Sequence, residues 1–396
     1  MAKPLRIGID IRGLLTGKIS GVEQYQLHIL KHLLAHDQVN KYVLFYVSYK
    51  DHDQLFDKLT QTYPFLTQKN VEVKTLKWPN LPILLHATFK PLNWPKADIV
   101  CGGLDVMFMP SPMLLPLSSK CAKVTTVHDL IFMIHPEFFT RSSRIWQWQM
   151  SYGYEIRTSD IAIAVSHSTK RDILRLTPAS PTQVRVVHEG VDASYFKDHS
   201  KLLPEVKTKF NIDSNYLYFV GSLEPRKNLS TLIRALHIIN QSKSDTIKLV
   251  ISGQKSWLFT EVKDLIAQLN LTSSVIFTGP VTETEKITLL QGAQAFVFPS
   301  VYEGFGLMVL EAFATQTPVI VANNSSLPEV AGGAALVFDT FDHQQLAREI
   351  TRLLTEPKLR TSLTTAGLAR AKQLSWDTAA KKTLELLTYA ASIHAR

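Results

Sequence analysis

The sequence has very little cysteine and no long uninterrupted hydrophobic run. Its 396 residues include two cysteines, Cys101 and Cys121, which excludes a disulfide framework and an all-cysteine metal site and favours a reducing compartment. The most apolar long stretch, residues 99–117, carries an aspartate and three prolines, a combination that a membrane-spanning helix would not normally contain. We expect the N-terminal residues to enter a first strand rather than a secretion signal. Together these features predict a cytoplasmic protein.

Tandem repeats and low-complexity tracts are also missing from the sequence. Hydrophobic residues make up 45% of the chain and charged residues 19%, so there is enough apolar surface for globular cores. The length is roughly two to three times that of one usual domain. We therefore expect two domains.

Positive charge is in excess and lies mainly in the first half of the chain. The net charge is +9, with 23 Lys and Arg against 17 Asp and Glu in residues 1–200, and 20 against 17 in residues 201–396. A basic surface attracts nucleic acid, anionic lipid and phosphorylated ligands alike. The charge therefore predicts an anionic partner for the first half without choosing among these classes.

Short apolar runs alternate with amphipathic stretches, which is typical of an α/β fold with parallel strands and helical crossovers. The predicted strands lie at 5–11, 42–47, 71–76, 106–109, 123–127, 161–165 and 184–187, and then at 216–220, 248–252, 275–278, 295–299, 319–322 and 335–338. A polar stretch at 192–213 separates the two series. We predict one domain over residues 1–200, a second over 201–376, and a closing helix from Asp377 onward.

The clearest motif follows the predicted strand 295–299 and runs from Glu303 to Glu311. Ligands of doubly wound sheets bind at the carboxyl ends of the strands. Gly304 and Gly306 allow a ligand to approach the backbone closely, and the helix that follows points its free N–H groups at the same place. This pattern predicts an anion site with a carboxylate on each side to accept hydrogen bonds from hydroxyls. The alternative is an ordinary helix start with one exposed glutamate.

Two adjacent cations, Arg226 and Lys227, come shortly after the predicted strand 216–220 and directly after Pro225. At a strand end they could pair with two phosphate groups and stabilise negative charge on a departing diphosphate. The alternative is a solvated basic pair in front of a helix.

The first half offers two weaker features. The loop from Gly13 to Gly21, which includes Gly17, could admit a phosphate at a helix N-terminus, but it is neither a G-x-G-x-x-G fingerprint nor a P-loop. His128 follows the predicted strand 123–127 and could donate a hydrogen bond, with Asp129 or the backbone setting its tautomer. A purely structural histidine is the alternative.

Together these motifs resemble the retaining glycosyltransferases of family 4, whose GT-B architecture has two facing Rossmann-like domains with a deep cleft between them. The resemblance covers nearly the whole chain and rests on the order and spacing of these segments: IGID, SGVEQY, VTTVHDLIF, HPEFF, AVSHSTKRDIL, VVHEGVDASYF, VGSLEPRKN, FVFPSVYEGFGLMVLEAFA, SSLPEVAGGAALVFD and a closing SWD helix. It implies that the final helix crosses back to the N-terminal domain.

The resemblance implies a role for each residue of the donor site. Glu303 would contact hydroxyls of the donor sugar, and Glu311 would contact the ribose hydroxyls of the nucleotide. Arg226 and Lys227 would bind the diphosphate. Backbone contacts to the sugar and phosphates would come from Gly304, Phe305, Gly306 and Leu307.

In the first domain, the resemblance places Gly21 near the phosphates and acceptor, and His128 beside the donor sugar at the catalytic centre. Basic side chains and a helix dipole would stabilise the departing diphosphate. Neither a metal nor a cofactor besides the nucleotide sugar is then implied, and no Asp-x-Asp pair directly follows a predicted strand. Retention could arise by front-face attack, in which the leaving phosphate accepts the acceptor proton, or by double displacement, for which the sequence nominates no nucleophile.

The SGVEQY and HDLIF segments look most like those of bacterial mannosyltransferases that build surface polysaccharide or lipid-linked glycans. We expect GDP-mannose as the donor, with UDP-glucose or another UDP-hexose as the alternative, and a glycan or lipid-linked acceptor. A catalytically silent nucleotide-sugar-binding protein of this fold is a further alternative. A nicotinamide oxidoreductase is disfavoured because its glycine fingerprint is missing, and a nucleic-acid binder because none of its motifs occurs.

Residues 81–95 and 141–157 combine basic, aromatic and apolar side chains. They could lie on the anionic inner face of the membrane or line an acceptor groove. The alternative is a pair of ordinary crossover helices whose aromatic side chains belong to the core.

Overall fold

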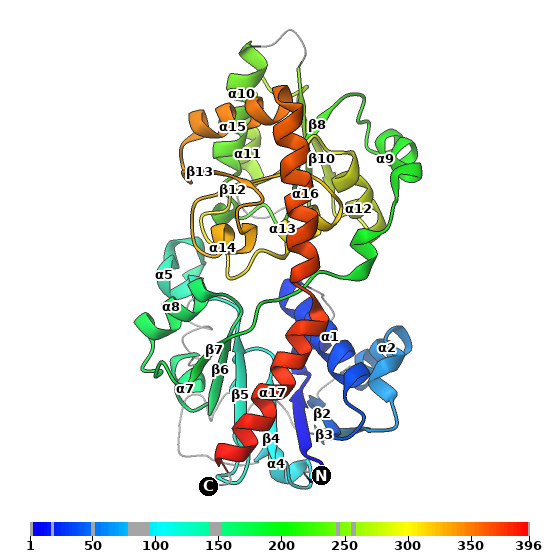
Figure 1. Ribbon diagram of the computed structural model, residues 1–396, viewed down its shortest axis with the longest axis vertical. Coiled ribbons are helices and arrows are strands. Elements are labelled where there is room, and N and C mark those ends of the chain that lie inside the picture. The colour runs from blue at the N-terminus through cyan, green and yellow to red at the C-terminus, as the bar shows by residue number, and fades with distance from the viewer. Residues whose placement is uncertain are drawn as a thin grey trace. The chain divides into compact units, whose positions relative to one another are not determined.

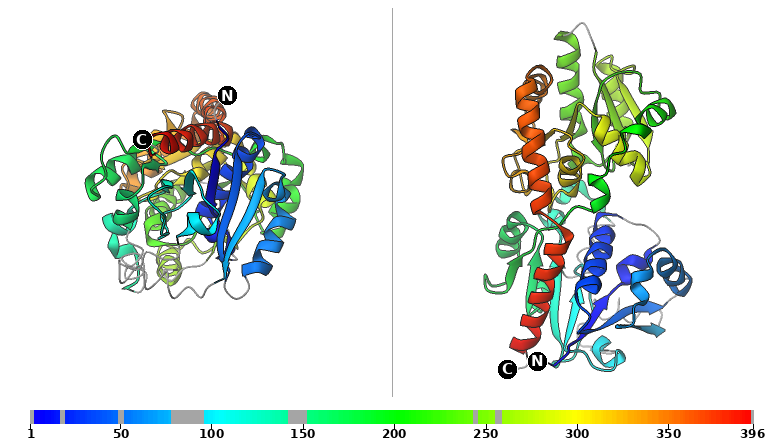
Figure 2. Two further views of the ribbon diagram at one scale, coloured as in Figure 1. Left: turned by 90° about the horizontal axis from the view of Figure 1, so that it is seen from below. Right: turned by 45° about the vertical axis from the view of Figure 1, so that its right-hand side comes forward.

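A computed structural model describes residues 3–16, 20–48, 52–77, 96–141, 152–242, 246–254 and 259–394. The chain folds as two compact units, Met1–Glu189 with Trp376–Arg396, and Gly190–Ser375 (Figures 1 and 2). The segment 81–95, most of the segment 141–157, and Gly17 lie outside the described residues.

The division between the units comes before the predicted one at residue 200. Hydrogen bonds tie this stretch to the second unit, because the His199 N–H donates to the Gln291 side chain, and the Gln291 amide donates to the Lys197 carbonyl (2.8 Å each). Residues 190–200 therefore belong to the second unit.

The first unit is built on a seven-stranded parallel sheet with the strand order β3-β2-β1-β4-β5-β6-β7. The chain starts at a central strand, winds out to one edge and then builds the other half, which is a doubly wound arrangement. The strands are β1 (Arg6–Asp10), β2 (Lys41–Ser48), β3 (Val71–Lys77), β4 (Val106–Met109), β5 (Ala122–Val127), β6 (Ile161–Ala164) and β7 (Val184–Val186). All seven lie within one residue of their predicted bounds.

Helices cover the sheet of the first unit, so its central strands are almost wholly buried. The helices are α1 (Gly21–His36), α2 (His52–Thr62), α4 (Ala97–Val100), α5 (Ile131–Ile134), α7 (Tyr152–Arg157), α8 (His167–Leu176) and α17 (Trp376–His394). Short 3-10 helices span Arg12–Thr16, Pro64–Thr67 and Pro136–Phe138. Even Lys123 of β5 is buried, and it pairs with the buried Glu155 of α7.

The last helix, α17, belongs to the first unit, as the resemblance implied. It packs against α1, β4 and β5 (Figure 1). The buried Trp376 stacks its ring on His28 of α1, with ring centres 5.0 Å apart and planes 7° apart. Further along the helix, Leu387 and Ala390 are also buried. The apolar face of α17 therefore completes the core of this unit.

The second unit has a six-stranded parallel sheet with the order β10-β9-β8-β11-β12-β13. The strands are β8 (Tyr216–Val220), β9 (Lys248–Ser252), β10 (Val275–Gly279), β11 (Ala295–Phe298), β12 (Val319–Ala322) and β13 (Leu336–Phe338), again within one residue of the prediction. The helices are α9 (Leu203–Lys209), α10 (Leu229–Ser242), α11 (Phe259–Gln268), α12 (Glu283–Gly292), α13 (Leu307–Ala314), α14 (Leu327–Ala331), α15 (His343–Thr355) and α16 (Pro357–Gln373). The 3-10 helices span Ala193–Phe196, Ser200–Leu202 and Pro225–Lys227.

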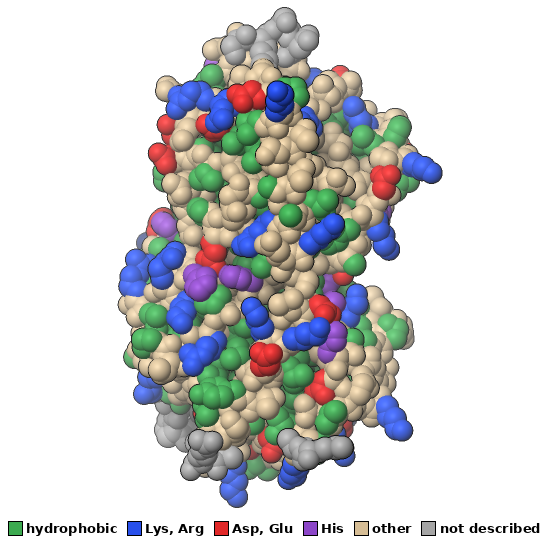
Figure 3. All heavy atoms as spheres, viewed as in Figure 1, with side chains coloured by type: hydrophobic (Ala, Val, Ile, Leu, Met, Phe, Trp, Pro, Cys, Tyr) green, Lys and Arg blue, Asp and Glu red, His purple; other side chains and the backbone are tan. Residues whose placement is uncertain are grey.

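The described residues bear on the membrane and basic-surface predictions. Among the described residues, no helix has both the length and the hydropathy needed to cross a bilayer. On the face shown in Figure 3, Lys and Arg side chains are interspersed with acidic and apolar ones. Cys101 and Cys121 are both free thiols in buried positions.

Candidate functional site

The loop between β11 and α13 carries Glu303 and is held by the turn that follows β12. The Glu303 N–H donates to the Ser325 hydroxyl (2.9 Å). The buried Ser326 hydroxyl lies within hydrogen-bond distance of the carbonyl oxygens of Glu303 and Phe305 (2.9 and 2.7 Å). The chain itself therefore sets the shape of this loop.

Gly306 ends the loop and comes directly before Leu307, the first residue of α13. Its backbone φ is 105°, which residues with a side chain rarely adopt. A Cβ at this position would also lie 3.0 Å from the Leu327 side chain. The backbone conformation therefore strongly favours glycine at 306, and a Cβ would also crowd the Leu327 side chain. Gly304 lies between Glu303 and the buried Phe305.

Arg226 and Lys227 both reach Glu303, so residues predicted from two separate motifs meet at one point. The Lys227 Nζ lies 2.5 Å from Glu303 Oε1, and the Arg226 Nη1 lies 3.1 Å from Oε2. Arg226 also pairs with Glu224 (2.8 Å). The Lys227 Nζ lies 4.7 Å from the ring centre of Phe298, in a cation–π contact. We call Arg226, Lys227 and Glu303 the cation–carboxylate centre.

Burial determines the electrostatics of this centre. Lys227 is 6% exposed, and the Glu303 side chain is 12% exposed. Desolvation acts to raise the pKa of Glu303, but the positive charges of Lys227 and Arg226 outweigh it and lower the pKa to about 2. Burial and the neighbouring Arg226 lower the pKa of Lys227 despite the attraction of Glu303. An anion that took the place of Glu303 would therefore meet one buried cation, Lys227, and one partly exposed cation, Arg226.

Two backbone features hold the basic loop at the strand ends. Gly253, directly after β9, has a φ of 138°, and a Cβ there would lie 2.0 Å from the carbonyl oxygen of Gly221. Asn228 is left-handed (φ 52°), and its amide donates to the carbonyls of Pro299 and Thr340 (3.1 and 2.7 Å). Gly253 was not predicted from the sequence, where its only signal is a lone glycine behind a predicted strand.

Glu311 lies on α13 in a separate buried cluster around Lys286 of α12. The Lys286 Nζ lies 3.0 Å from Glu311 Oε2, 3.1 Å from Glu283 Oε2 and 5.1 Å from the Tyr195 ring centre. The Tyr195 hydroxyl donates to Glu283. Burial acts to lower the pKa of Lys286, but the carboxylates of Glu311 and Glu283 outweigh it and raise the pKa. Glu311 is thus not an exposed glutamate, and it is held by Lys286, which was not predicted from the sequence.

In the first unit, His128 follows β5, and both of its ring nitrogens face acceptors of the chain. Nε2 lies 2.8 Å from the Pro110 carbonyl oxygen, and Nδ1 lies 3.4 Å from Glu189 Oε1. The Tyr25 ring meets the imidazole edge-on at 4.7 Å between ring centres. Two acceptors favour the doubly protonated ring. Glu189 is 5% exposed and was not predicted, although a carboxylate behind a strand was a signal.

The interaction between His128 and Glu189 is expected to make the free energy of unfolding depend on pH. Burial acts to lower the pKa of His128, but the hydrogen bond and charge of Glu189 outweigh it and raise the pKa. A raised folded-state pKa adds stability that is fully present below the unfolded value, about 6.5, and is lost as the pH rises through the folded value. The stability deficit of Glu189→Gln, measured by urea unfolding, should therefore be larger at about pH 6 than at about pH 9. Equal deficits at both pH values would contradict the assignment.

Gly21 is the first residue of α1. The Glu23 carboxylate accepts hydrogen bonds from the Ser20 N–H (2.8 Å) and hydroxyl (2.5 Å) and so caps the helix start. A Cβ on Gly21 would meet no atom of the described residues within 4 Å. Packing therefore does not require glycine here, unlike at 306. One turn further, Tyr25 joins the start of α1 to His128.

Two doubly wound parallel sheets with these strand orders define a protein of the GT-B fold, which solved structures of similar topology share. The chain belongs to the family 4 glycosyltransferases. The family model described as Glycosyltransferase Family 4 matches residues 19–195, and the model described as Glycosyl transferases group 1 matches residues 204–370. The predicted fold class and family are confirmed, whereas the roles of single residues stay predictions.

Several relatives are mannosyltransferases by name. The O-antigen chain mannosyltransferase B of Escherichia coli is 29% identical over 66% of this chain and 68% of its own length. The serotype-specific mannosyltransferase WbdA of Escherichia coli is 27% identical over 67% of this chain, which spans 33% of WbdA. Among solved structures, HepE of Anabaena, in complex with UDP and glucose, matches 97% of this chain and 100% of its own at 18% identity and a TM-score of 0.72.

Proposed function

We propose that the chain transfers mannose from GDP-mannose to a glycan or lipid-linked acceptor, with retention and without a metal ion or further cofactor. The observation that carries the proposal is the meeting of Arg226 and the buried Lys227 with Glu303 at the carboxyl ends of β8 and β11. The choice of mannose follows the names of the Escherichia coli relatives. UDP-glucose or another UDP-hexose is the second candidate, since HepE was crystallised with UDP-glucose.

The cation–carboxylate centre suits a diphosphate because two cations lie together and one of them, Lys227, is buried. Phosphate oxygens would replace the Glu303 carboxylate as partners of Arg226 and Lys227. Glu303 would then be free to accept hydrogen bonds from hydroxyls of the donor sugar. One carboxylate thus holds the cations before the donor binds and the sugar afterwards.

The charges of Arg226 and Lys227 would also assist the cleavage of the donor. The bond between the anomeric carbon and the phosphate oxygen breaks, and the acceptor oxygen bonds to that carbon on the same face. The acceptor proton passes to the leaving phosphate oxygen. Arg226 and Lys227 stabilise the negative charge that develops on the diphosphate, and preorganised charges in a water-poor site are effective at this. Front-face attack of this kind needs no protein nucleophile.

The remaining predicted residues would complete donor binding. Lys286 keeps Glu311 paired and in place to accept hydrogen bonds from ribose hydroxyls. Backbone groups of the loop 304–307 would face the sugar and phosphates. In the first unit, Gly21 leaves room for a ligand at the start of α1, and Glu189 holds the His128 imidazole in place.

A screen of nucleotides and nucleotide sugars tests this function. GDP and GDP-mannose should raise the melting temperature more than UDP and UDP-glucose do, and GDP-mannose should be slowly hydrolysed. A larger shift with UDP and a UDP-hexose would establish the second candidate. Stabilisation with neither hydrolysis nor transfer to an acceptor would indicate a silent binding protein. No stabilisation by any compound would refute a donor site.

We also propose that the protein is cytoplasmic and touches the anionic inner face of the membrane through its more basic first half. The support is the excess of 23 Lys and Arg over 17 Asp and Glu in residues 1–200. Sedimentation with vesicles that contain phosphatidylserine should then weaken as salt rises. No sedimentation at low salt would refute the contact.

A further inference from the structure

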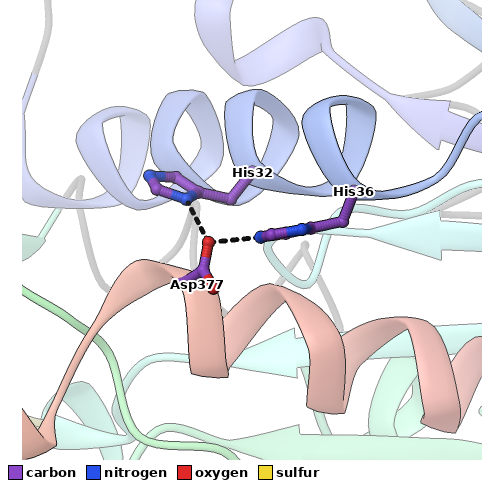
Figure 4. A group of neighbouring side chains, drawn as sticks. All are labelled: His32, His36 and Asp377. Atoms are coloured by element: carbon purple, nitrogen blue, oxygen red, sulfur yellow. Dashed lines mark hydrogen bonds and ion pairs between the residues drawn. The ribbon is translucent and has the colours of Figure 1, made fainter.

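Two histidines one helical turn apart on α1, His32 and His36, face the first turn of α17 (Figure 4). The His32 Nδ1 lies 3.4 Å from Asp377 Oδ1, and the His36 Nε2 contacts the same oxygen. The three ligand atoms lie within 4.8 Å of one another. The other oxygen of Asp377 is held by Lys381, one turn along α17 (3.0 Å).

This set of atoms suits a transition-metal ion. Imidazole nitrogens and a carboxylate oxygen are common zinc ligands, and a tetrahedral site with bonds of about 2.1 Å separates neighbouring ligand atoms by roughly 3.4 Å. Only small side-chain rotations would bring the three atoms to that spacing. The Lys381 contact leaves one Asp377 oxygen for the metal and orients the carboxylate, as outer contacts of metal ligands do.

The cluster is also accessible to an ion. The side chains of His32, His36 and Asp377 are 25%, 33% and 43% exposed. Their helices lie side by side in the first unit. An ion could therefore enter from solvent and keep a water molecule as its fourth ligand.

We propose that His32, His36 and Asp377 form a Zn²⁺ site that joins α1 to α17. The chain enters the first unit at Trp376, directly after Ser375, the last residue of the second unit. At this point the helix is anchored by the stacking of Trp376 on His28. A metal bridge one residue later would strengthen this anchor. The site is structural and takes no part in the transfer reaction.

The test is Zn²⁺ binding to the full chain, measured by competition with a chromophoric chelator and by the melting temperature. One Zn²⁺ per chain should bind and raise the melting temperature, and Mg²⁺ should do neither because it prefers oxygen ligands. His32→Ala, His36→Ala and Asp377→Asn should each weaken Zn²⁺ binding by more than about 10-fold. Because these variants also lose ion pairs, the readout is the zinc-dependent shift rather than the melting temperature itself.

Two control variants keep the test specific. His135→Ala removes a partly exposed histidine that lies 2.9 Å from the Glu137 carboxylate, and this variant should bind Zn²⁺ as the wild type does. His167→Ala with His188→Ala removes another close imidazole pair, with ring centres 5.8 Å apart. Loss of the zinc-dependent shift only in this double variant, unchanged binding by His36→Ala, or no stoichiometric binding by the wild type would each overturn the proposal.

Discussion

Replacing Glu303 by Gln is expected to remove most transfer while nucleotide binding survives. Glutamine keeps the shape of the side chain but loses the charge that pairs with Arg226 and Lys227. In the proposed mechanism the carboxylate binds the sugar, whereas the diphosphate binds the two cations. We expect kcat to fall by about 10²–10³-fold, as for the loss of one group that stabilises a transition state.

The same substitution separates the two roles of Glu303. The buried Lys227 and the partly exposed Arg226 would lose the carboxylate that they share, so the free energy of unfolding should fall by about 3 kcal/mol without ligand. GDP would supply replacement oxygens. Thermal shift assays should therefore show that GDP raises the melting temperature of the variant by more than it raises that of the wild type.

The matched control is Glu205→Gln, which changes an exposed carboxylate in the first turn of α9 of the same unit. Its activity and stability should stay close to wild type. A Glu303→Gln enzyme with an unchanged rate would show that the site has been misplaced. Loss of the GDP response in that variant would show that Glu303 holds the nucleotide.

Lys227→Met should have the second large effect. It should act on the diphosphate leaving group, whereas Glu303→Gln acts on the sugar. The lysine is buried against Phe298 and Glu303, and Met can occupy the apolar part of its space. Without the lysine charge, the diphosphate loses a partner when the donor binds and again when the diphosphate leaves. We expect kcat/KM to fall by about 10³-fold or more and the stabilisation by GDP to shrink.

Lys209→Met is the control for this prediction. Lys209 pairs with Glu285 on the surface and is 58% exposed, so its loss should change little. An equal loss of GDP response in both variants would point to a general effect of net charge. If GDP raised the melting temperature of Lys227→Met as much as it raises that of the wild type, the diphosphate would have to bind elsewhere.

Much of the fold could be predicted because strand signals are local. A buried parallel strand is a short apolar run bounded by polar residues, and such runs mark β4 and β11 clearly. The domain boundary was less predictable. The polar stretch after β7 has no period of its own, and contacts such as that between His199 and Gln291 assign it to the second unit.

The site was predicted in its parts but not in its connections. Arg226, Lys227 and Glu303 were each chosen because they follow strands, yet their direct contact depends on the adjacency of β8 and β11 in the sheet. Partners such as Lys286 and Glu189 were missed, since a single charged residue inside an apolar pattern has no sequence signal that distinguishes pairing from solvation.

The amino-acid sequence by itself determined the class of fold, the number of domains and the family, because hydrophobic period and motif spacing are properties of neighbouring residues. Only the tertiary structure decided which charged side chains lie in contact with one another. Glu303 and Arg226 are 77 residues apart in the chain, and Asp377 and His36 are 341 apart. Electrostatic and ligand interactions act over a few ångströms in space, so they follow from strand order and helix packing rather than from separation along the chain.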